Sequence, residues 1–373
     1  MKLRQLSMLM FILVLSFLAM SCGQQKDKWQ GTIEEVDGVT LVKNPLEPMY
    51  GEDALELEED LTIGEAEGRE EYMFSQLARL SVDDNGFIYA LDFKAKHIKV
   101  FDENGAYIRT IGKPGEGPGE FTIPGYFGIT PNNELFVGEI VKISFFSLEG
   151  EFIRSQNVSA QGLIYLKYAS NGEPIGIRMI MTDDNPRTDL EKYSSEFEPV
   201  FAFDSLPIVR QNNYNLQRLF IRRAIRWDIL SGKYVVCGYP EQEYKLKVFD
   251  LDGNHIKKIE RAFIPIKVTD KDIEYEMERL GIKSKEEVVA PDYYPPYSWI
   301  YSDDEGRLFI STWERLSESE SYYYDVFDAE GRYLLRKAIE YAPQFFKDGK
   351  MYVISTDEDG YQYIKRYNVT WNY

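Results

Sequence analysis

The chain has few of the residues on which much enzyme and metal chemistry depends. Its 373 residues include only two histidines, His97 and His255, and two cysteines, Cys22 and Cys237. A zinc site built from several histidines cannot be assembled from this set. No Gly-x-Ser-x-Gly motif predicts a serine nucleophile with a histidine base. The sequence therefore favours binding over catalysis.

Positive charge is also scarce. The chain carries 43 Lys and Arg against 62 Asp and Glu, a formal net charge of −19 at pH 7, and no long basic stripe. Recognition of a phosphate backbone needs clustered Lys and Arg, so this composition argues against a nucleic-acid partner. The acidity favours solubility, with cationic ligands as an alternative interpretation.

No apolar run is long enough to cross a membrane. Lys2 and Arg4 precede an apolar stretch from Leu9 to Met20, which has the length of a secretory signal core. The following Ser21-Cys22, after Leu18 and Ala19-Met20, resembles the cleavage site of bacterial lipoproteins, with Met20 as a departure from the usual pattern.

We therefore predict a signal peptide over residues 1–21, lipidation of Cys22 and a tether over residues 22–37. The alternative is an ordinary signal peptide with an unrelated cysteine. Acyl chains on Cys22 would hold the protein on a membrane of the cell envelope, the outer membrane in a Gram-negative cell, facing the periplasm or the exterior. If Cys22 is lipidated, no disulfide can form within one chain, and Cys237 in its apolar run is expected in the core.

The remainder of the chain is repetitive. Residues 80–112, LSVDDNGFIYALDFKAKHIKVFDENGAYIRTIG, contain four short β-runs and two acid/Asn-Gly turns of the kind that tight hairpins require. Weaker copies span about 126–156, 163–209, 224–253, 299–338 and 344–373. A four-stranded unit buries one face per neighbour, so several units must stack radially before a core exists.

The last copy ends too early to supply its fourth strand. Leu61 to Gly68 is similar to Arg109 through Gly117, which is a fourth strand plus the link to the next repeat. We expect Leu55 to Gly64 to supply the missing strand and close the ring. The predicted fold is all-β, a six-bladed β-propeller of four-stranded antiparallel blades over residues 38–373. The alternative is a five-bladed ring with a separate hairpin at Val39 to Lys43.

These repeats carry a family resemblance. Three segments are similar to NHL-repeat propellers: Gly112 to Phe121 with its flanking strand, Asn85 to Asp92, and His97 to Asp102. More closely, the chain resembles six-bladed β-propeller lipoproteins of Gram-negative gut bacteria. The resemblance implies the fold and an envelope location but no activity, because the wider superfamily includes scaffolds, sugar or peptide binders and a few enzymes.

Propeller geometry sorts the loops onto two faces. Short turns follow the first and third strands on the bottom face, so long segments at 180–198, 261–297 and 313–321 are expected on the top face. Such one-sided length variation is typical of a binding surface. In the largest segment, Thr269 to Leu280 has the composition of a capped helix, and an aromatic, proline-rich strip follows.

Two sets of residues on this face are candidates for binding. The aromatic residues Tyr293, Tyr294, Tyr297 and Trp313 could stack on a sugar or a peptide, and Arg222, Arg223 and Arg226 could hold a carboxylate. The alternatives are tyrosines packed on neighbouring blades and arginines paired with acidic residues between blades.

No cofactor is predicted. The acidic turns at Asp83 to Gly86 and Asp357 to Gly360 lack the alternating ligands and distant Glu of a calcium loop, and we interpret them as hairpin turns. Calcium in the central channel remains an alternative that no motif supports. The glycine-rich run from Gly112 to Gly119 lacks the Lys-Ser/Thr of a phosphate loop and is expected to link two blades.

The sequence predicts a lipid-anchored, monomeric binding or scaffold propeller for a glycan, a peptide or an envelope protein. The first alternative is a metal-assisted hydrolase or lyase that uses carboxylates around the channel. The second is a purely structural subunit of an envelope complex, which would expose an apolar patch.

Overall fold

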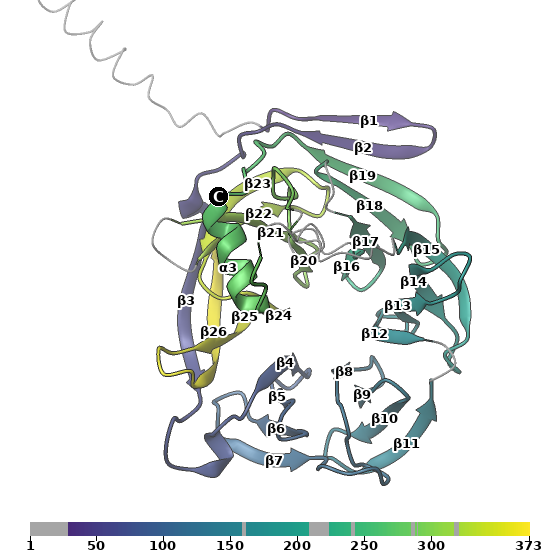
Figure 1. Cartoon of the computed structure of the whole chain (residues 1–373), viewed down its shortest axis with the longest axis vertical. Helices are drawn as coiled ribbons and strands as arrows, with labels where there is room; N and C mark the ends of the chain where they lie inside the picture. Colours follow the sequence, from purple (N-terminus) through teal and green to yellow (C-terminus); the bar gives the residue numbers. More distant parts are fainter. Residues whose placement is uncertain are drawn as a thin grey trace, which may run out of the picture.

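The architecture is a ring of six four-stranded antiparallel sheets around one axis (Figure 1). The computed structural model describes residues 29–158, 162–208, 224–239, 243–284, 288, 290–316 and 321–373. In Figure 1 the first strand of each blade lies beside the central axis and the fourth lies at the rim. The six-bladed β-propeller expected from the repeats is confirmed.

Within each blade, neighbouring strands run antiparallel, and in five of the six blades they are also consecutive in the chain. The first three blades are β4 (Leu77–Val82), β5 (Ile88–Asp92), β6 (His97–Phe101) and β7 (Tyr107–Ile111); β8 (Tyr126–Ile129), β9 (Glu134–Gly138), β10 (Lys142–Ser147) and β11 (Phe152–Asn157); and β12 (Leu163–Tyr168), β13 (Pro174–Ile180), β14 (Arg187–Tyr193) and β15 (Pro199–Pro207). The last three are β16 (Arg226–Leu230), β17 (Tyr234–Gly238), β18 (Lys245–Asp250) and β19 (His255–Arg261); β20 (Trp299–Ser302), β21 (Leu308–Arg315), β22 (Tyr322–Phe327) and β23 (Tyr333–Ile339); and β24 (Pro343–Lys347), β25 (Lys350–Thr356), β26 (Gln362–Trp371) and β3 (Leu55–Ile63). Every predicted repeat corresponds to one blade.

The ring closes through a strand from the N-terminal part of the chain. β3 pairs antiparallel with β26, in a register that runs from Leu55 opposite Trp371 to Ile63 opposite Ile364. The ends of this ladder are buried, because Leu55, Ile63 and Ile364 are each at most 2% exposed. The closing strand expected at Leu55 to Gly64 is therefore confirmed, and the five-bladed alternative is wrong.

The core lies between the faces of adjacent blades. Phe309 of β21 in the fifth blade stacks on Phe346 of β24 in the sixth, with ring centroids 4.4 Å apart. Tyr126 of the second blade meets Tyr165 of the third edge to face at 5.8 Å. Large rings fill the wedge-shaped space between neighbouring twisted sheets. The 27 Tyr and 22 Phe of the chain supply rings for these interfaces.

An Asp-x-x-Gly pattern forms many of the hairpin turns. In the turn after β4, Asp83 Oδ1 accepts hydrogen bonds from the backbone N–H groups of Asn85 and Phe87, both at 2.9 Å, and Gly86 adopts a φ of +82°. The turn after Asp357 uses the same bonds. These carboxylates bind backbone donors of their own turns, as expected for turns.

The N-terminal region adds a hairpin to the fourth blade. β1 (Thr32–Val36) and β2 (Val39–Asn44) are antiparallel, and β2 pairs parallel with β19 to make a six-stranded sheet. β1 falls within residues 22–37, for which a tether is expected. The folded part therefore begins before residue 38, because the strand hydrogen-bonds to β2, which covers the open edge of β19.

From this hairpin the chain crosses the rim of the fifth blade before it reaches the sixth. Met49 N–H donates to the carbonyl of Tyr333 at 3.2 Å, and Tyr50 N–H donates to the carbonyl of Leu334 at 2.7 Å. β3 follows directly. We call residues 29–64 the strap, because they contact the outer edges of three consecutive blades.

One buried amide fixes the strap at the boundary between the fourth and fifth blades. Asn44 Oδ1 accepts from Trp29 Nε1 at 3.0 Å and from Tyr333 N–H at 2.7 Å. Its Nδ2 donates to the carbonyls of Glu260 at 3.1 Å and Gly331 at 2.9 Å. The side chain is 6% exposed. All four hydrogen-bonding positions of the amide are thus used, and the partners lie at Trp29, on β19 and at the turn that leads into β23.

The insertion expected at 180–198 is wrong in part. β13 ends at Ile180, a short connection follows, and β14 occupies residues 187–193, so most of this segment belongs to the third blade. The insertion between β19 and β20 contains the helix α3 (Asp270–Leu280). Thr269 caps α3 through a reciprocal pair of bonds with Asp272, as the sequence predicts. No helix within the described ranges is both long and apolar enough to span a membrane.

We predict that Asn44→Ala lowers the free energy of unfolding by roughly 2–4 kcal/mol, because it leaves at least two buried backbone groups without partners at about 1–3 kcal/mol each. The matched control is Lys43→Ala in the same strand. The Lys43 side chain is 47% exposed and pairs with Glu34, which is equally exposed, so its loss should cost less than about 1 kcal/mol. Urea unfolding followed by circular dichroism measures both. Equal destabilisation by the two variants would contradict this role of Asn44.

Candidate functional site

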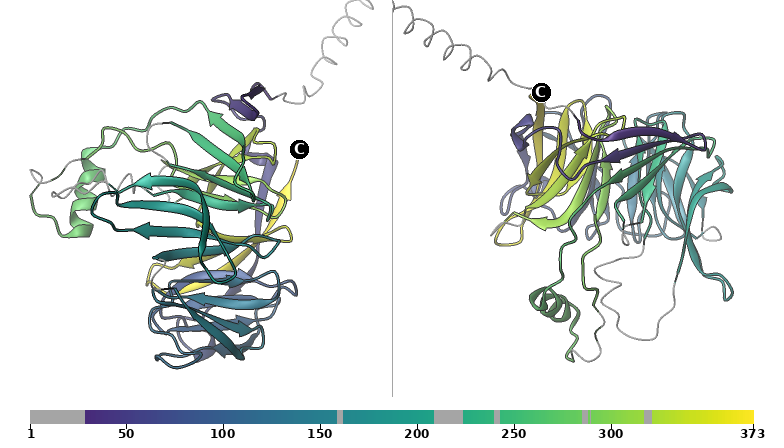
Figure 2. Two further views of the ribbon diagram at one scale, coloured as in Figure 1. Left: turned by 90° about the vertical axis from the view of Figure 1, so that its right-hand side faces the viewer. Right: turned by 90° about the horizontal axis from the view of Figure 1, so that it is seen from above.

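The insertion between the fourth and fifth blades stands on one face of the ring. Figure 2 shows α3 projecting from this face, which we call the top face because the connections between blades lie there. At its base, Tyr294 N–H donates to the carbonyl of Ile266 at 2.8 Å, and Val268 N–H donates to the carbonyl of Asp292 at 3.0 Å. Val268 packs with Ile273 and Met277 of α3. The insertion therefore has a small core of its own.

The four aromatic residues predicted on this face occupy three different environments. Tyr294 stacks on Trp313 of β21, with centroids 5.0 Å apart and planes 17° apart. Tyr293 is 53% exposed, and Tyr297 is fully buried. The Tyr297 hydroxyl donates to the carbonyl of Lys245 at 3.0 Å, and its ring packs against Tyr244. Tyr297 is thus a core residue and is closed to a ligand, because it fills the junction of two blades.

The predicted arginine cluster is only partly described. Arg222 and Arg223 lie outside the described residues, as does Cys22. Arg226 begins β16, is 7% exposed, and places its guanidinium 4.3 Å from the ring centroid of Trp299 in the next blade. This contact joins two blades through a cation–π interaction.

A cavity of about 310 Å³ lies at the base of the insertion. It combines apolar walls with two guanidinium groups and one carboxylate, and it is lined by Leu46, Arg261, Phe263, Ile264, Ile266, Pro296, Thr312, Glu314 and Arg336. We call it the top cavity. Arg261 ends β19 and Arg336 lies on β23, so no sequence motif joins them.

A buried carboxylate fixes the two arginines of the top cavity. Asp325 is fully buried and lies 3.2 Å from Arg261 Nη1 and 3.5 Å from Arg336 Nε. Tyr333 Oη also donates to Asp325 at 2.9 Å. Burial alone would lower the pKa of Arg261, but Asp325 raises this pKa overall. On its outer side, Arg336 Nη2 contacts Glu314 at 2.9 Å, and the Glu314 side chain is 45% exposed.

The central channel holds a second cavity, of about 520 Å³. The first strands of all six blades line it, and it extends to the turns of the opposite face, the bottom face. Arg79, Lys167 and Asp228 contribute charged side chains to its wall, together with the rings of Tyr165 and Tyr301. We call it the channel cavity.

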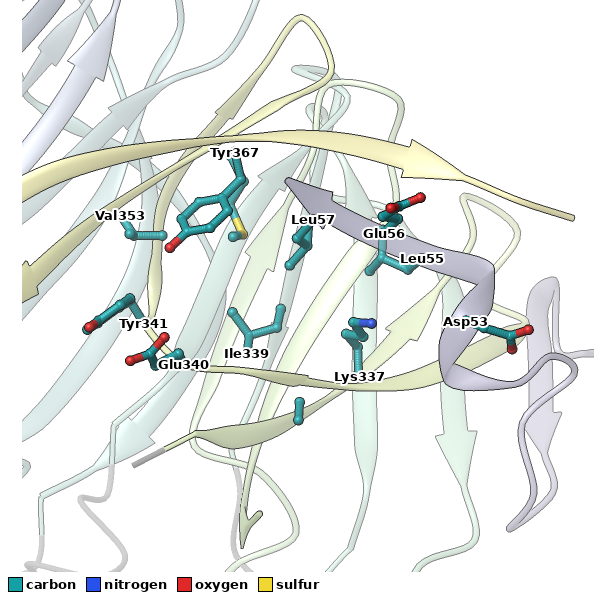
Figure 3. A pocket seen from close by; sticks show the side chains of 12 residues that line it. Asp53, Leu55, Glu56, Leu57, Lys337, Ile339, Glu340, Tyr341, Val353 and Tyr367 are labelled. Atoms are coloured by element: carbon teal, nitrogen blue, oxygen red, sulfur yellow. The ribbon is translucent and has the colours of Figure 1, made fainter. Parts of the chain in front are cut away.

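A third cavity, of about 490 Å³, follows the ring-closing seam at the rim. Figure 3 shows Leu57 of β3, Ile339 of β23 and Tyr367 of β26 facing it from three strands. Its floor is apolar, and Lys337 and Glu340 are among the charged residues at its edge.

The described parts of the chain contain no group of three or more His, Cys, Asp or Glu side chains that could hold a metal ion. His97 begins β6 at the top face, and His255 begins β19 after a bottom-face turn, so the two histidines lie at opposite faces. Cys237 is buried in β17, where burial raises the pKa of its thiol well above the ordinary value. Its core placement agrees with expectation.

Comparison with known proteins supports the fold. A family model described as a six-bladed beta-propeller matches residues 65–172. A Bacteroides fragilis protein described as exported has a TM-score of 0.55 at 12% identity, over 90% of this chain and 100% of its own. This likeness shows a shared fold alone.

Two further solved structures match with lower TM-scores. A member of the DUF4221 family from Bacteroides vulgatus has a TM-score of 0.49 at 14% identity, over 86% of this chain and 100% of its own. A gluconolactonase from Xanthomonas campestris has a TM-score of 0.42 at 9% identity, over 79% of this chain and 87% of its own. No curated protein matches the chain. The NHL-like repeats and the lipid anchor stay predictions.

We predict that Tyr294→Ala loosens the insertion and leaves the ring intact, because an aromatic stack contributes about 0.5–1.5 kcal/mol beyond its buried area. Hydrogen exchange should become faster at residues 262–298 and stay unchanged in β16–β19. Tyr293→Ala, which removes an exposed ring from the neighbouring position, is the control and should leave exchange unchanged. Similar exchange in the two variants would refute an anchoring role for the Tyr294–Trp313 stack.

The histidines predict a loss of stability in mild acid. Burial lowers the pKa of both His97 and His255. The unfolded chain therefore takes up protons below about pH 6.5 before the folded chain does, so the free energy of unfolding falls as the pH decreases from 6.5 towards 5. The stability that the two neutral histidines contribute is fully present above pH 6.5.

Urea unfolding at several pH values between 7.5 and 5 tests this dependence. The double variant His97→Gln, His255→Gln should lose most of the slope in this window, whatever its stability at pH 7.5. Carboxylates with lowered pKa, such as Glu139, act only nearer pH 4 and below, so they do not mask the result. An unchanged slope in the double variant would rule out the histidines as its source.

Proposed function

We propose that the protein is a lipid-anchored binding module of the cell envelope whose top face holds a peptide segment of an envelope partner. The observation that carries the proposal is the insertion folded over the top cavity, with Arg261 and Arg336 fixed at its floor. Apolar walls around a fixed guanidinium suit an apolar side chain next to a carboxylate. The predicted acylation of Cys22 supports the envelope location.

The surface around the top cavity supports a polypeptide ligand. Ile264 is 70% exposed, Tyr275 of α3 is 61% exposed, and Tyr293 is 53% exposed. Exposed apolar and aromatic side chains on one insertion provide contact area at little entropic cost. The net negative charge of the chain repels acidic surfaces over long range. Within the cavity, the two guanidinium groups attract a carboxylate at short range, which makes this site selective for an acidic group.

Glu314 occupies the position that a ligand carboxylate would take. It contacts the outer side of Arg336 and is nearly half exposed, whereas Asp325 holds the inner side and is fully buried. An exposed ion pair contributes little stability, so an incoming carboxylate can displace Glu314 at low cost.

The test is a peptide array with free and amidated C-termini, probed with the full chain in detergent. Free carboxylates should bind about tenfold more tightly or better, since a hydrogen bond to a charged group contributes about 1.5–3 kcal/mol. Glu314→Gln should strengthen binding by removing the competitor, and Ile264→Asp should weaken it. Ile153→Asp, on the exposed outer strand β11, is the control and should have no effect.

Two results would overturn the proposal. One is equal binding of free and amidated peptides together with no effect of Ile264→Asp. The other is saturable binding on a glycan array that Ile264→Asp abolishes, which would assign the same face to a glycan instead of a peptide.

A further inference from the structure

Charged side chains on the innermost strands line the channel cavity, and one of them is a cation without an ionic partner among the described residues. Arg79 on β4, Lys167 on β12 and Asp228 on β16 line the same cavity from three blades. Lys167 Nζ forms an ion pair with Asp228 Oδ1. The other carboxylate oxygen, Asp228 Oδ2, accepts from Ser302 N–H at 2.9 Å and from Ser302 Oγ at 3.2 Å. Both oxygens of Asp228 are therefore occupied, and one cation remains.

Arg79 is that cation. Its Nε donates to the carbonyl of Gly125 at 3.4 Å, and its guanidinium carbon lies 4.8 Å from the ring centroid of Tyr165. Among the residues that the structure describes, no carboxylate lies within ion-pair distance of Arg79, and its two terminal nitrogens have no hydrogen-bond acceptor. The guanidinium therefore presents two adjacent donors, the geometry that a carboxylate accepts with both oxygens.

Electrostatic effects on neighbouring groups agree with this placement. Burial alone would lower the pKa of Lys167, Asp228 raises it overall, and Arg79 acts against that rise. Burial and Asp228 raise the pKa of Tyr301, and Arg79 opposes this effect too. The charge of Arg79 thus reaches side chains from the third and fifth blades, as expected if it points into the shared channel.

The aromatic wall beside Arg79 is fixed before any ligand arrives. Tyr165 meets Tyr126 of the second blade and Trp227 of the fourth edge to face, both with centroids 5.8 Å apart. Tyr301 packs against Tyr324. A ring-shaped molecule can lie against these rings without reorganising them, and the cavity of about 520 Å³ has the size of a small-molecule site.

The acidic residues at the bottom mouth have partners of their own. Asp83 accepts from the backbone of its turn and from Tyr89 Oη. Lys347 forms an ion pair with Asp84, and Asp304 Oδ2 accepts from the N–H of Asp348 at 2.7 Å. Arg307 Nη1 contacts Asp303 at 3.0 Å. The contacts of Lys347 with Asp84 and of Asp348 with Asp304 join neighbouring blades, whereas the Arg307–Asp303 pair lies within the fifth blade. None of these carboxylates is within ion-pair distance of Arg79.

We propose that the channel cavity is a binding site for a small ring-bearing carboxylate, with the carboxylate on Arg79 and the ring against Tyr165 or Tyr301. Lys167 adds a second positive charge, and Asp228 keeps Lys167 in place. The site lies on the propeller axis and is separate from the top cavity, so its existence does not depend on the function proposed for the insertion.

Isothermal titration of the full chain in detergent tests the site with two probes. D-glucuronate carries its carboxylate on a polar ring, and benzoate carries it on an aromatic ring. Glucose and benzamide are the neutral counterparts. At least one carboxylate should bind with a Kd of about 1 mM or tighter, at least about tenfold better than its neutral counterpart, and more weakly at high salt. The better probe identifies the kind of ring.

Substitutions of Arg79 separate a ligand contact from a structural effect. Arg79→Met should lower the affinity for the tighter-binding probe at least about tenfold. Arg79→Lys should retain part of this affinity, because an ammonium group keeps the charge but cannot donate to both carboxylate oxygens in the same plane. Arg109→Met, in the outer strand β7 of the same blade, is the matched control and should bind as the parent does. Thermal unfolding of each variant reports whether the ring persists.

The proposal fails if neither carboxylate binds with a Kd of about 1 mM or tighter, if the neutral counterparts bind equally well, or if Arg79→Met and Arg109→Met behave alike. Ile264→Asp on the top face should leave probe binding unchanged. Loss of probe binding in that variant would move the carboxylate site from the channel to the insertion and overturn the assignment.

Discussion

The hydrogen bonds between β3 and β26 are the constraint on which the rest of the molecule depends. Blades in a ring contact their neighbours mainly through side chains, so the first and last blades would separate without a covalent or hydrogen-bonded link. Here the N-terminal part of the chain supplies the outer strand of the last blade. Closure also leaves no pair of unmatched blade faces exposed to solvent.

The strap extends this closure across three blades. β2 covers the edge of β19, the backbone at Met49 and Tyr50 pairs with β23, and β3 completes the sixth blade. Because Asn44 bonds to the fourth and fifth blades at once, the strap cannot slide along the rim without breaking buried hydrogen bonds. This fixed rim holds the six inner strands at constant spacing, which a channel site assembled from several blades requires.

The sequence predicted the periodic part of the structure well. The Asp-x-x-Gly turns, the six blades, the closing strand and the cap at Thr269 are local patterns that repeat or have a known chemical signature. A hairpin at Val39 to Lys43 was part of the five-bladed alternative, but its pairing with β19 was not predicted, because this parallel pairing joins residues more than 200 positions apart. β14 was read as part of an insertion because its sequence, RTDLEKY, is mostly polar. Its buried Asp189 and Glu191 are compensated by Arg187 and Arg178, which the strand pattern does not show.

The cavities were beyond sequence analysis for a related reason. Aromatic residues close in sequence, such as Tyr294 and Tyr297, proved to have unrelated environments, whereas Arg79, Lys167 and Asp228 meet only because three blades converge. The Arg79 hydrogen bond to Gly125 is exposed to solvent, so its guanidinium stays hydrated until a ligand arrives, and the ring of Tyr165 adds a cation–π contact. The chain has 62 acidic residues, and none of those described is an ion-pair partner of Arg79. Its two terminal nitrogens are therefore available to an external anion, which is the basis of the proposed channel site.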